Sequence, residues 1–148
     1  MSTRSESRHA SDSAKQREIE REVLAALSLE LGVSIPSPLP PQLATLKLDG
    51  YVSGPVPVLV EVFAHVGPSK GGQRHKIAHD MTKLLLAEKL LGVPCRELIA
   101  VIDKAAIAHM AKGWDGAFAD AFGIERKVVP GFEDRHEAMR EVQVRQRR

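Results

Sequence analysis

The chain has 148 residues, 43% of them hydrophobic and 27% charged, which is ordinary for one soluble globular domain and excludes a wholly disordered or fibrous chain. Its 21 basic and 19 acidic residues leave a formal net charge of +2, so charge alone does not indicate a nucleic-acid-binding protein. Aromatic residues make up only 4%, which argues against a platform for stacking many single-stranded bases. Cys95 is the single cysteine, which excludes an internal disulfide and a cysteine-based zinc cluster.

The two ends of the chain are polar. Residues 1–14 are rich in serine, lack the apolar core of a secretory signal, and are expected to be disordered. The sequence contains no apolar run of about 20 residues that would span a bilayer, so we expect no membrane partner and a cytoplasmic location. One domain is predicted at residues 15–132, followed by a basic, helix-prone tail at 133–148.

The first half of the domain combines a helix with a β-hairpin. Apolar residues recur at helical spacing over Lys15–Leu31, and the following glycine predicts the helix end. A proline-rich stretch comes next, with room for a short edge strand at Val33–Ile35. Alternating apolar residues over Leu43–Val52 and an apolar run over Val56–Val66 predict two antiparallel strands, joined by the turn at residues 53–55.

The second half alternates helices with strands. The strongest helix pattern covers Gln73–Leu91, and Leu98–Ile102 is an uninterrupted apolar run, typical of a strand buried on both faces. A helix is predicted from residue 104 to about residue 112, with an interruption at residues 113–116 and a continuation to residue 122. Trp114 is expected to pack this interruption against the sheet.

Residues 124–129 form the last predicted strand. The element order mixes a hairpin with crossovers. It therefore predicts an α/β fold in which a mixed central sheet is flanked by helices.

Two acidic residues stand among apolar neighbours in the predicted hairpin. Glu61 lies within Val-Leu-Val-Glu-Val-Phe (58–63), and Asp49 lies within Leu-Lys-Leu-Asp-Gly-Tyr-Val (46–52). An uncompensated buried charge costs several kcal/mol, so each carboxylate needs a partner. A divalent cation between them would explain both, because hard cations such as Mg²⁺ choose oxygen ligands. Glu20 similarly falls inside the apolar arc of the first helix.

At these residues the chain resembles the PD-(D/E)xK nuclease superfamily over about residues 18–129. The resemblance implies a restriction-endonuclease-like α-β-β-β-α-β core, here with an extra helix and strand. Asp49 matches the metal-binding aspartate, Glu61 the paired acid, and Glu20 the glutamate that the first helix of this fold often contributes. The resemblance thus implies a nuclease that hydrolyses DNA phosphodiester bonds with Mg²⁺ or Mn²⁺ at Asp49 and Glu61. Many nucleases of this fold pair to cut two strands, so it also implies a homodimer.

The chain departs from the family at Phe63, which occupies the position of the catalytic lysine. Some members of the fold supply this lysine from the following helix. Here Lys76 is the first candidate because it lies near the helix start, and Lys83 and Lys70 are the others. With no such cation, the chain would be a catalytically degenerate nuclease-fold protein that acts as a nucleic-acid-binding or assembly subunit. Because the motif is short, an unrelated α/β binding module is a third interpretation.

Overall fold

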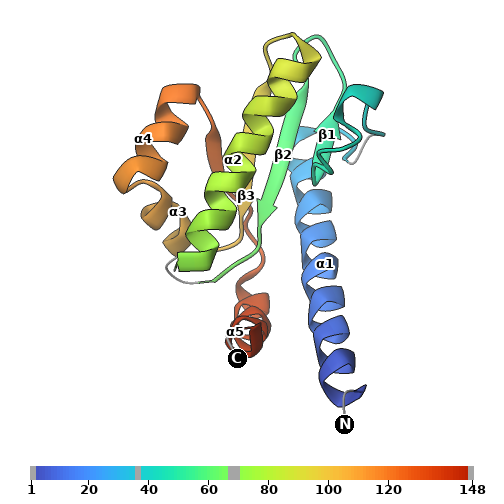
Figure 1. The fold of residues 1–148 in the computed structure, drawn as a ribbon, viewed down its shortest axis with the longest axis vertical. Helices are drawn as coiled ribbons and strands as arrows, with labels where there is room; N and C mark the ends of the chain where they lie inside the picture. The colour runs from blue at the N-terminus through green and yellow to red at the C-terminus, as the bar shows by residue number, and fades with distance from the viewer. Residues whose placement is uncertain (1–2, 36–37, 67–70, 147–148) are drawn as a thin grey trace.

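The computed structural model describes residues 3–35, 38–66 and 71–146, with side chains placed at 14–35, 38–66, 73–108 and 110–144. In this part of the chain a four-stranded sheet is flanked by α-helices (Figure 1). The helices are α1 (Thr3–Leu31), α2 (Gly71–Leu91), α3 (Lys104–Met110), α4 (Gly113–Phe122) and α5 (His136–Gln146), with short 3₁₀ helices η1 (Pro41–Leu43) and η2 (Glu133–Arg135). The strands are β1 (Gly50–Val52), β2 (Val58–Phe63), β3 (Arg96–Val101) and β4 (Glu125–Val128).

The sheet has the strand order β1-β2-β3-β4 and is mixed. Strands β1 and β2 are antiparallel, with Gly50 opposite Val60, whereas β2, β3 and β4 run parallel to one another. The predicted hairpin and the predicted mixed sheet are therefore confirmed. The parallel pairs are joined by crossovers, α2 between β2 and β3, and α3 with α4 between β3 and β4.

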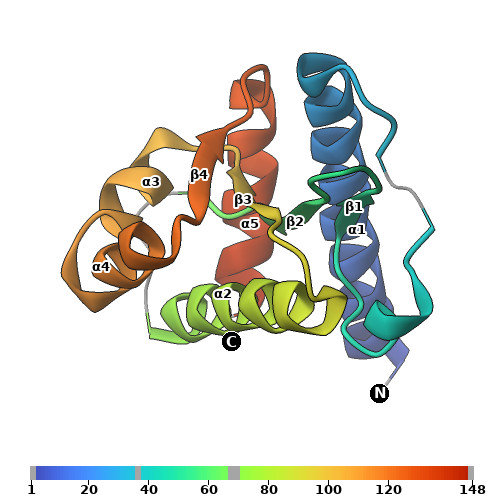
Figure 2. The same cartoon turned by 90° about the horizontal axis from the view of Figure 1, so that it is seen from above.

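The sheet separates two apolar layers, as the view from above shows (Figure 2). Because side chains alternate along a strand, even positions of β2 and β3 point to one face and odd positions to the other. The even face packs with α1 and α5 through a cluster that includes Leu27, Val60, Val62, Leu98, Ala100 and Met139. The odd face packs with α2, α3 and α4 through a cluster that includes Leu59, Phe63, Met81, Leu84, Ile99, Met110 and Ala119.

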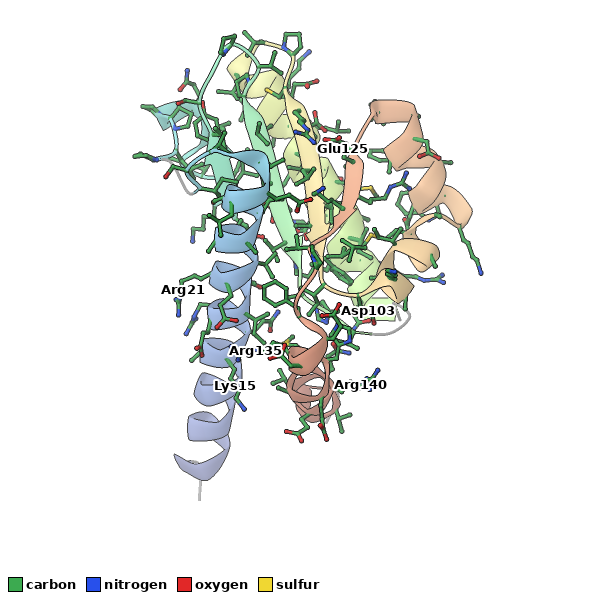
Figure 3. The ribbon with its side chains drawn as sticks, turned by 180° about the vertical axis from the view of Figure 1, so that it is seen from behind. Lys15, Arg21, Asp103, Glu125, Arg135 and Arg140 are labelled. Atoms are coloured by element: carbon green, nitrogen blue, oxygen red, sulfur yellow. The ribbon has the colours of Figure 1, made fainter. Side chains whose placement is uncertain are left out.

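Helix α5 belongs to this core, although residues 133–148 were expected to form a tail outside the domain. Met139 and Val142 are buried. The buried Gln143 accepts a hydrogen bond from the Val66 N–H at 2.8 Å and donates one to the Val66 carbonyl at 3.1 Å, so it extends the hydrogen-bonding edge of β2. Arg135, just before α5, reaches α1 and donates to Glu22 at 2.9 Å (Figure 3).

The structure differs from three expectations about the first 52 residues. Helix α1 begins at Thr3 and continues through most of the segment expected to be disordered. Val33–Ile35 does not form a strand, and the predicted strand over residues 43–52 is reduced to β1. The prolines at 40 and 41 favour the 3₁₀ turn η1 instead. Two strands, and not three, therefore lie between α1 and α2 in the described residues.

The prediction for Trp114 is also wrong, because this side chain is 66% exposed. Helix α4 starts at Gly113, so the expected interruption is already helical. Gly116 faces the interior, where an added Cβ would lie 2.6 Å from the Ala111 carbonyl carbon, and Ala119 is buried one turn later. Trp114 precedes Gly116 by two residues, about 200° around the helix, and so lies on the outer side. None of the helices in the described residues is long and apolar enough to cross a membrane.

Candidate active site

Asp49 and Glu61 come together where strand β1 begins. Gly50 is opposite Val60, so the next pair of positions in the same register is Asp49 and Glu61. The Asp49 carboxylate accepts a hydrogen bond from the Val62 N–H at 2.8 Å, which fixes its side chain against β2. The two carboxyl groups lie within hydrogen-bonding reach of each other, so the structure brings the two predicted metal ligands to one point.

Glu61 is buried, with 1% of its surface exposed. Burial and the neighbouring Asp49 raise the pKa of its carboxyl group to about 9, and the charge of Asp80 acts in the same direction. Lys83 opposes this shift without outweighing it. At neutral pH, this shift favours the protonated form of Glu61 beside the Asp49 carboxyl group. A bound cation is the natural replacement for that proton.

Lys83 is the ammonium group in contact with Glu61. Its Nζ lies 2.8 Å from Glu61 Oε1 and donates to the Lys47 carbonyl at 3.3 Å. Lys47 has a φ of 52°, a left-handed conformation that is uncommon outside glycine and occurs at functional sites more often than elsewhere. The ammonium approaches Oε1 at ion-pair distance but not in hydrogen-bonding direction, so this buried oxygen has no directed hydrogen bond within the described residues.

Lys76, the first candidate for the missing cation, is paired with Asp80 instead. The two side chains are 2.7 Å apart on α2, and Asp80 is buried. Burial lowers the pKa of Lys76, but the carboxyl groups of Asp80, Asp49 and Glu61 outweigh burial and raise it overall. Lys76 therefore interacts with the charges of the site from about two turns before Lys83 on α2, whereas Lys83 contacts Glu61 directly. Lys70 lies outside the described residues.

Glu20 approaches the same group of charges from α1. Burial raises the pKa of its carboxyl group, Asp49 and Asp80 raise it further, and Lys76 and a hydrogen bond with Gln16 lower it. Lys76 of α2 also interacts with the charge of Asp49, so both helices bring charged side chains near this residue. The predicted auxiliary acid is thus close enough to act on the site electrostatically.

Phe63, at the family's lysine position, is fully buried in the core beneath α2. Its ring lies 4.6 Å from the ring of His65, which hydrogen-bonds Gln73 at the start of α2. This position of β2 therefore faces the packed interior. A lysine would be costly there. An ammonium group near Glu61 comes instead from Lys83 of α2.

The residues present fit a six-coordinate cation such as Mg²⁺, which keeps several waters and needs one or two protein carboxylates. Asp49 and Glu61 supply two carboxyl groups, and Glu61 Oε1 is a buried acceptor with no directed donor. Within the described residues, no group of three or more histidine, cysteine, aspartate or glutamate side chains is arranged to enclose a metal ion. A cation held by Asp49 and Glu61 would therefore take two protein carboxyl groups and keep several waters.

Sequence reasoning found the acidic pair but ranked the lysines in the wrong order of proximity. Lys76, Asp80 and Lys83 lie on one flank of α2 because they are three and four residues apart. Which of them meets Glu61 depends on the angle at which α2 crosses β2, and periodicity does not give that angle.

Comparison of the chain with protein-family models, curated proteins and solved structures finds no match.

Proposed function

We propose that this chain is a metal-dependent nuclease of the restriction-endonuclease-like fold that hydrolyses DNA phosphodiester bonds at Asp49, Glu61 and Lys83. The observation that supports it best is the pairing of the Asp49 and Glu61 carboxyl groups, with an ammonium group 2.8 Å from the buried one. The α/β fold with a mixed sheet agrees with this proposal, although the described residues hold one strand fewer than the family core.

In this proposal Asp49 and Glu61 hold Mg²⁺ or Mn²⁺. Such a cation, when bound, makes water a better nucleophile and neutralises charge on the phosphate. Lys83 is the group that pairs with a phosphate oxygen and stabilises the additional charge of the transition state. Glu20 adds negative charge beside Asp49 and strengthens the attraction for a divalent cation.

A catalytically degenerate nuclease-fold protein is the second candidate, and Phe63 is the residue that favours it. The position of Lys83 favours the active enzyme, because α2 places an ammonium group against Glu61 despite the loss of the strand lysine. The active enzyme hydrolyses DNA, whereas the degenerate protein does not, whether it acts as a nucleic-acid-binding or as an assembly subunit. A cleavage assay therefore separates them.

The test compares cleavage of supercoiled plasmid DNA by the wild type and four variants in Mg²⁺ or Mn²⁺. Glu61→Gln removes a metal ligand and Lys83→Met removes the transition-state cation, so each is expected to reduce the rate by about 10²- to 10³-fold. Lys76→Met is expected to have a smaller effect, because Lys76 is paired with Asp80. Lys89→Met removes an exposed charge from the same helix and is the matched control.

Metal-dependent cleavage that Glu61→Gln and Lys83→Met leave unchanged would contradict the proposal at this site. Plasmid binding by the wild type without any cleavage in either metal would favour the degenerate protein. A larger loss of cleavage rate in Lys76→Met than in Lys83→Met would assign the catalytic ammonium group to Lys76 and not to Lys83.

A further inference from the structure

A pocket with charged residues in its lining lies on the other flank of α2, between this helix and α4. Its volume is about 270 Å³. It is lined by Arg74, His75 and Ala78 of α2 and by Lys112, Trp114 and Asp115 at the start of α4. None of these residues contributes to the site around Glu61, so the pocket needs its own explanation.

Trp114 is the unusual residue of this pocket. It is the single tryptophan of the chain and is 66% exposed, whereas large aromatic side chains normally contribute to a core. Phe118, one turn later on α4, lies edge-to-face with it at a ring separation of 6.3 Å and restricts its motion. An exposed and supported indole at the rim of a pocket suits the stacking of a planar ligand.

The charged residues that line the pocket indicate which other groups such a ligand carries. Arg74 and Lys112 bring two positive charges to the pocket, as an anionic group such as a phosphate requires. Asp115 contributes a buried carboxylate oxygen, Oδ1, that has no hydrogen-bond partner within the described residues. A buried acceptor without a donor is costly, so a shift of this side chain toward an N–H or O–H group of a ligand in the pocket is favoured.

We infer that this pocket binds one unpaired nucleotide of a DNA strand. The base stacks on Trp114, the phosphate lies by Arg74 and Lys112, and an amino, imino or hydroxyl group of the nucleotide donates to Asp115. The inference rests on the proposed function, since it names the form of DNA that the nuclease would take. The low aromatic content agrees with a pocket for one base and not with a long stacking surface.

The pocket and the candidate active site lie on opposite flanks of α2. Arg74 and Ala78 line the pocket, whereas Lys76 and Lys83 turn toward Asp80 and Glu61. A helix with its side chains is about 10–12 Å across, a distance of a few nucleotides along a DNA strand. The inferred unpaired nucleotide therefore lies a few positions from the phosphate that is cut.

The single tryptophan makes the test direct. Fluorescence of Trp114 is followed while oligo(dT), a duplex of equal length or dTMP is added to Glu61→Gln protein without divalent cations, so that no DNA is cut. We expect oligo(dT) to quench the fluorescence at much lower concentration than the duplex or dTMP. With a labelled oligo(dT), Trp114→Ala is expected to weaken binding by about 5- to 150-fold, the value of one stacked base.

Two further variants check the roles of the charged groups. Lys112→Gln is expected to reduce the salt dependence of binding by about one unit of slope, as loss of one phosphate contact does. Lys89→Gln removes the same charge from the far end of α2 and is expected to leave the affinity nearly unchanged. Circular dichroism verifies that each variant is folded.

The outcomes separate this inference from the proposed function. Equal affinity of Trp114→Ala and its parent for oligo(dT) would overturn the inference, whether or not the wild type cleaves DNA. Quenching by dTMP at the same concentration as by oligo(dT) would contradict the inference that the ligand belongs to a DNA strand. It would instead assign the pocket to free nucleotides. Oligonucleotide binding that depends on Trp114, in a wild type that cuts no DNA, would support the pocket and overturn only the nuclease.

Discussion

The carboxyl group of Glu61 is shielded from water. Its neighbours are the carboxyl group of Asp49 and the ammonium group of Lys83. Burial favours its neutral form, and the proximity of Asp49 favours it further. The pair therefore binds a proton well above the pH at which glutamate usually loses it. The proposed affinity for a metal ion would have the same origin, since it too requires an excess of negative charge in a poorly hydrated site.

Stability against pH tests this account of Glu61 in the absence of metal. The carboxyl group has a pKa of about 9 in the folded chain and 4.5 in the unfolded chain. Its contribution to stability is therefore fully present below pH 4.5 and is lost as the pH rises toward about 9. The loss amounts to as much as about 1.4 kcal/mol per pH unit. In EDTA, the free energy of unfolding of the wild type is expected to fall over this range, and that of Glu61→Gln to fall much less. Urea denaturation at a series of pH values measures it.

A second acidic pair provides the control for that experiment. Burial and the neighbouring Glu88 raise the pKa of Glu97 to about 7, so its contribution is lost as the pH rises from about 4.5 to about 7. Glu97→Gln is therefore expected to flatten only the lower part of the pH dependence. Parallel loss of stability by the wild type and Glu61→Gln between about pH 7 and pH 9 would contradict the assignment of the high pKa to Glu61.

Strand β1 is the element that fixes Asp49, and Gly50 explains how it packs. A Cβ added at Gly50 would lie 3.0 Å from Ile35, 3.1 Å from Leu24 and 3.2 Å from Val60, so a helix, a loop and a strand all approach this residue closely. The pair Asp49-Gly50 resembles a turn signal in sequence. In the structure the glycine lies in β1, where close packing and not a left-handed turn excludes a larger residue.

Gly50→Ala is expected to force these neighbours apart and to displace Asp49 from Glu61. Overpacking of this kind costs about 1–3 kcal/mol, so the midpoint of urea unfolding should fall and metal-dependent cleavage should fall with it. Ser53→Ala, at an exposed position just beyond β1, is the matched control and should behave as the wild type. Unchanged stability and cleavage in Gly50→Ala would show that β1 tolerates a side chain here.

Helix α2, strand β3 and the β1–β2 hairpin were predictable because their apolar patterns are long and local. The reduction of the strand over residues 43–52 to three residues was not, because it depends on the Asp49 side chain accepting the hydrogen bond from Val62. The contact of Lys83 with Glu61 depends on a crossing angle, and the exposure of Trp114 depends on where α4 begins. Each of these facts arises from tertiary packing, which a periodic pattern does not contain.

At the scale of the whole molecule, four elements meet at the candidate site. Strands β1 and β2 bring the two carboxyl groups, α2 brings Lys83 from one face of the sheet, and α1 brings Glu20 from the other. Figure 1 shows α1 and α2 on the two sides of the β1–β2 edge. A cation bound there would connect the two helical layers and stabilise the fold by about 2.7 kcal/mol at a hundredfold excess over its dissociation constant.

Calorimetric titration with Mg²⁺ in buffers of different ionisation enthalpy is the most direct measurement, because it reports metal binding and proton release together. At neutral pH, the wild type is expected to bind Mg²⁺ with release of about one proton, the one that Glu61 retains. Asp49→Asn is expected to bind much more weakly, and Glu61→Gln to release no proton. Mg²⁺ binding that releases no proton in the wild type, or that both variants leave unchanged, would contradict the account.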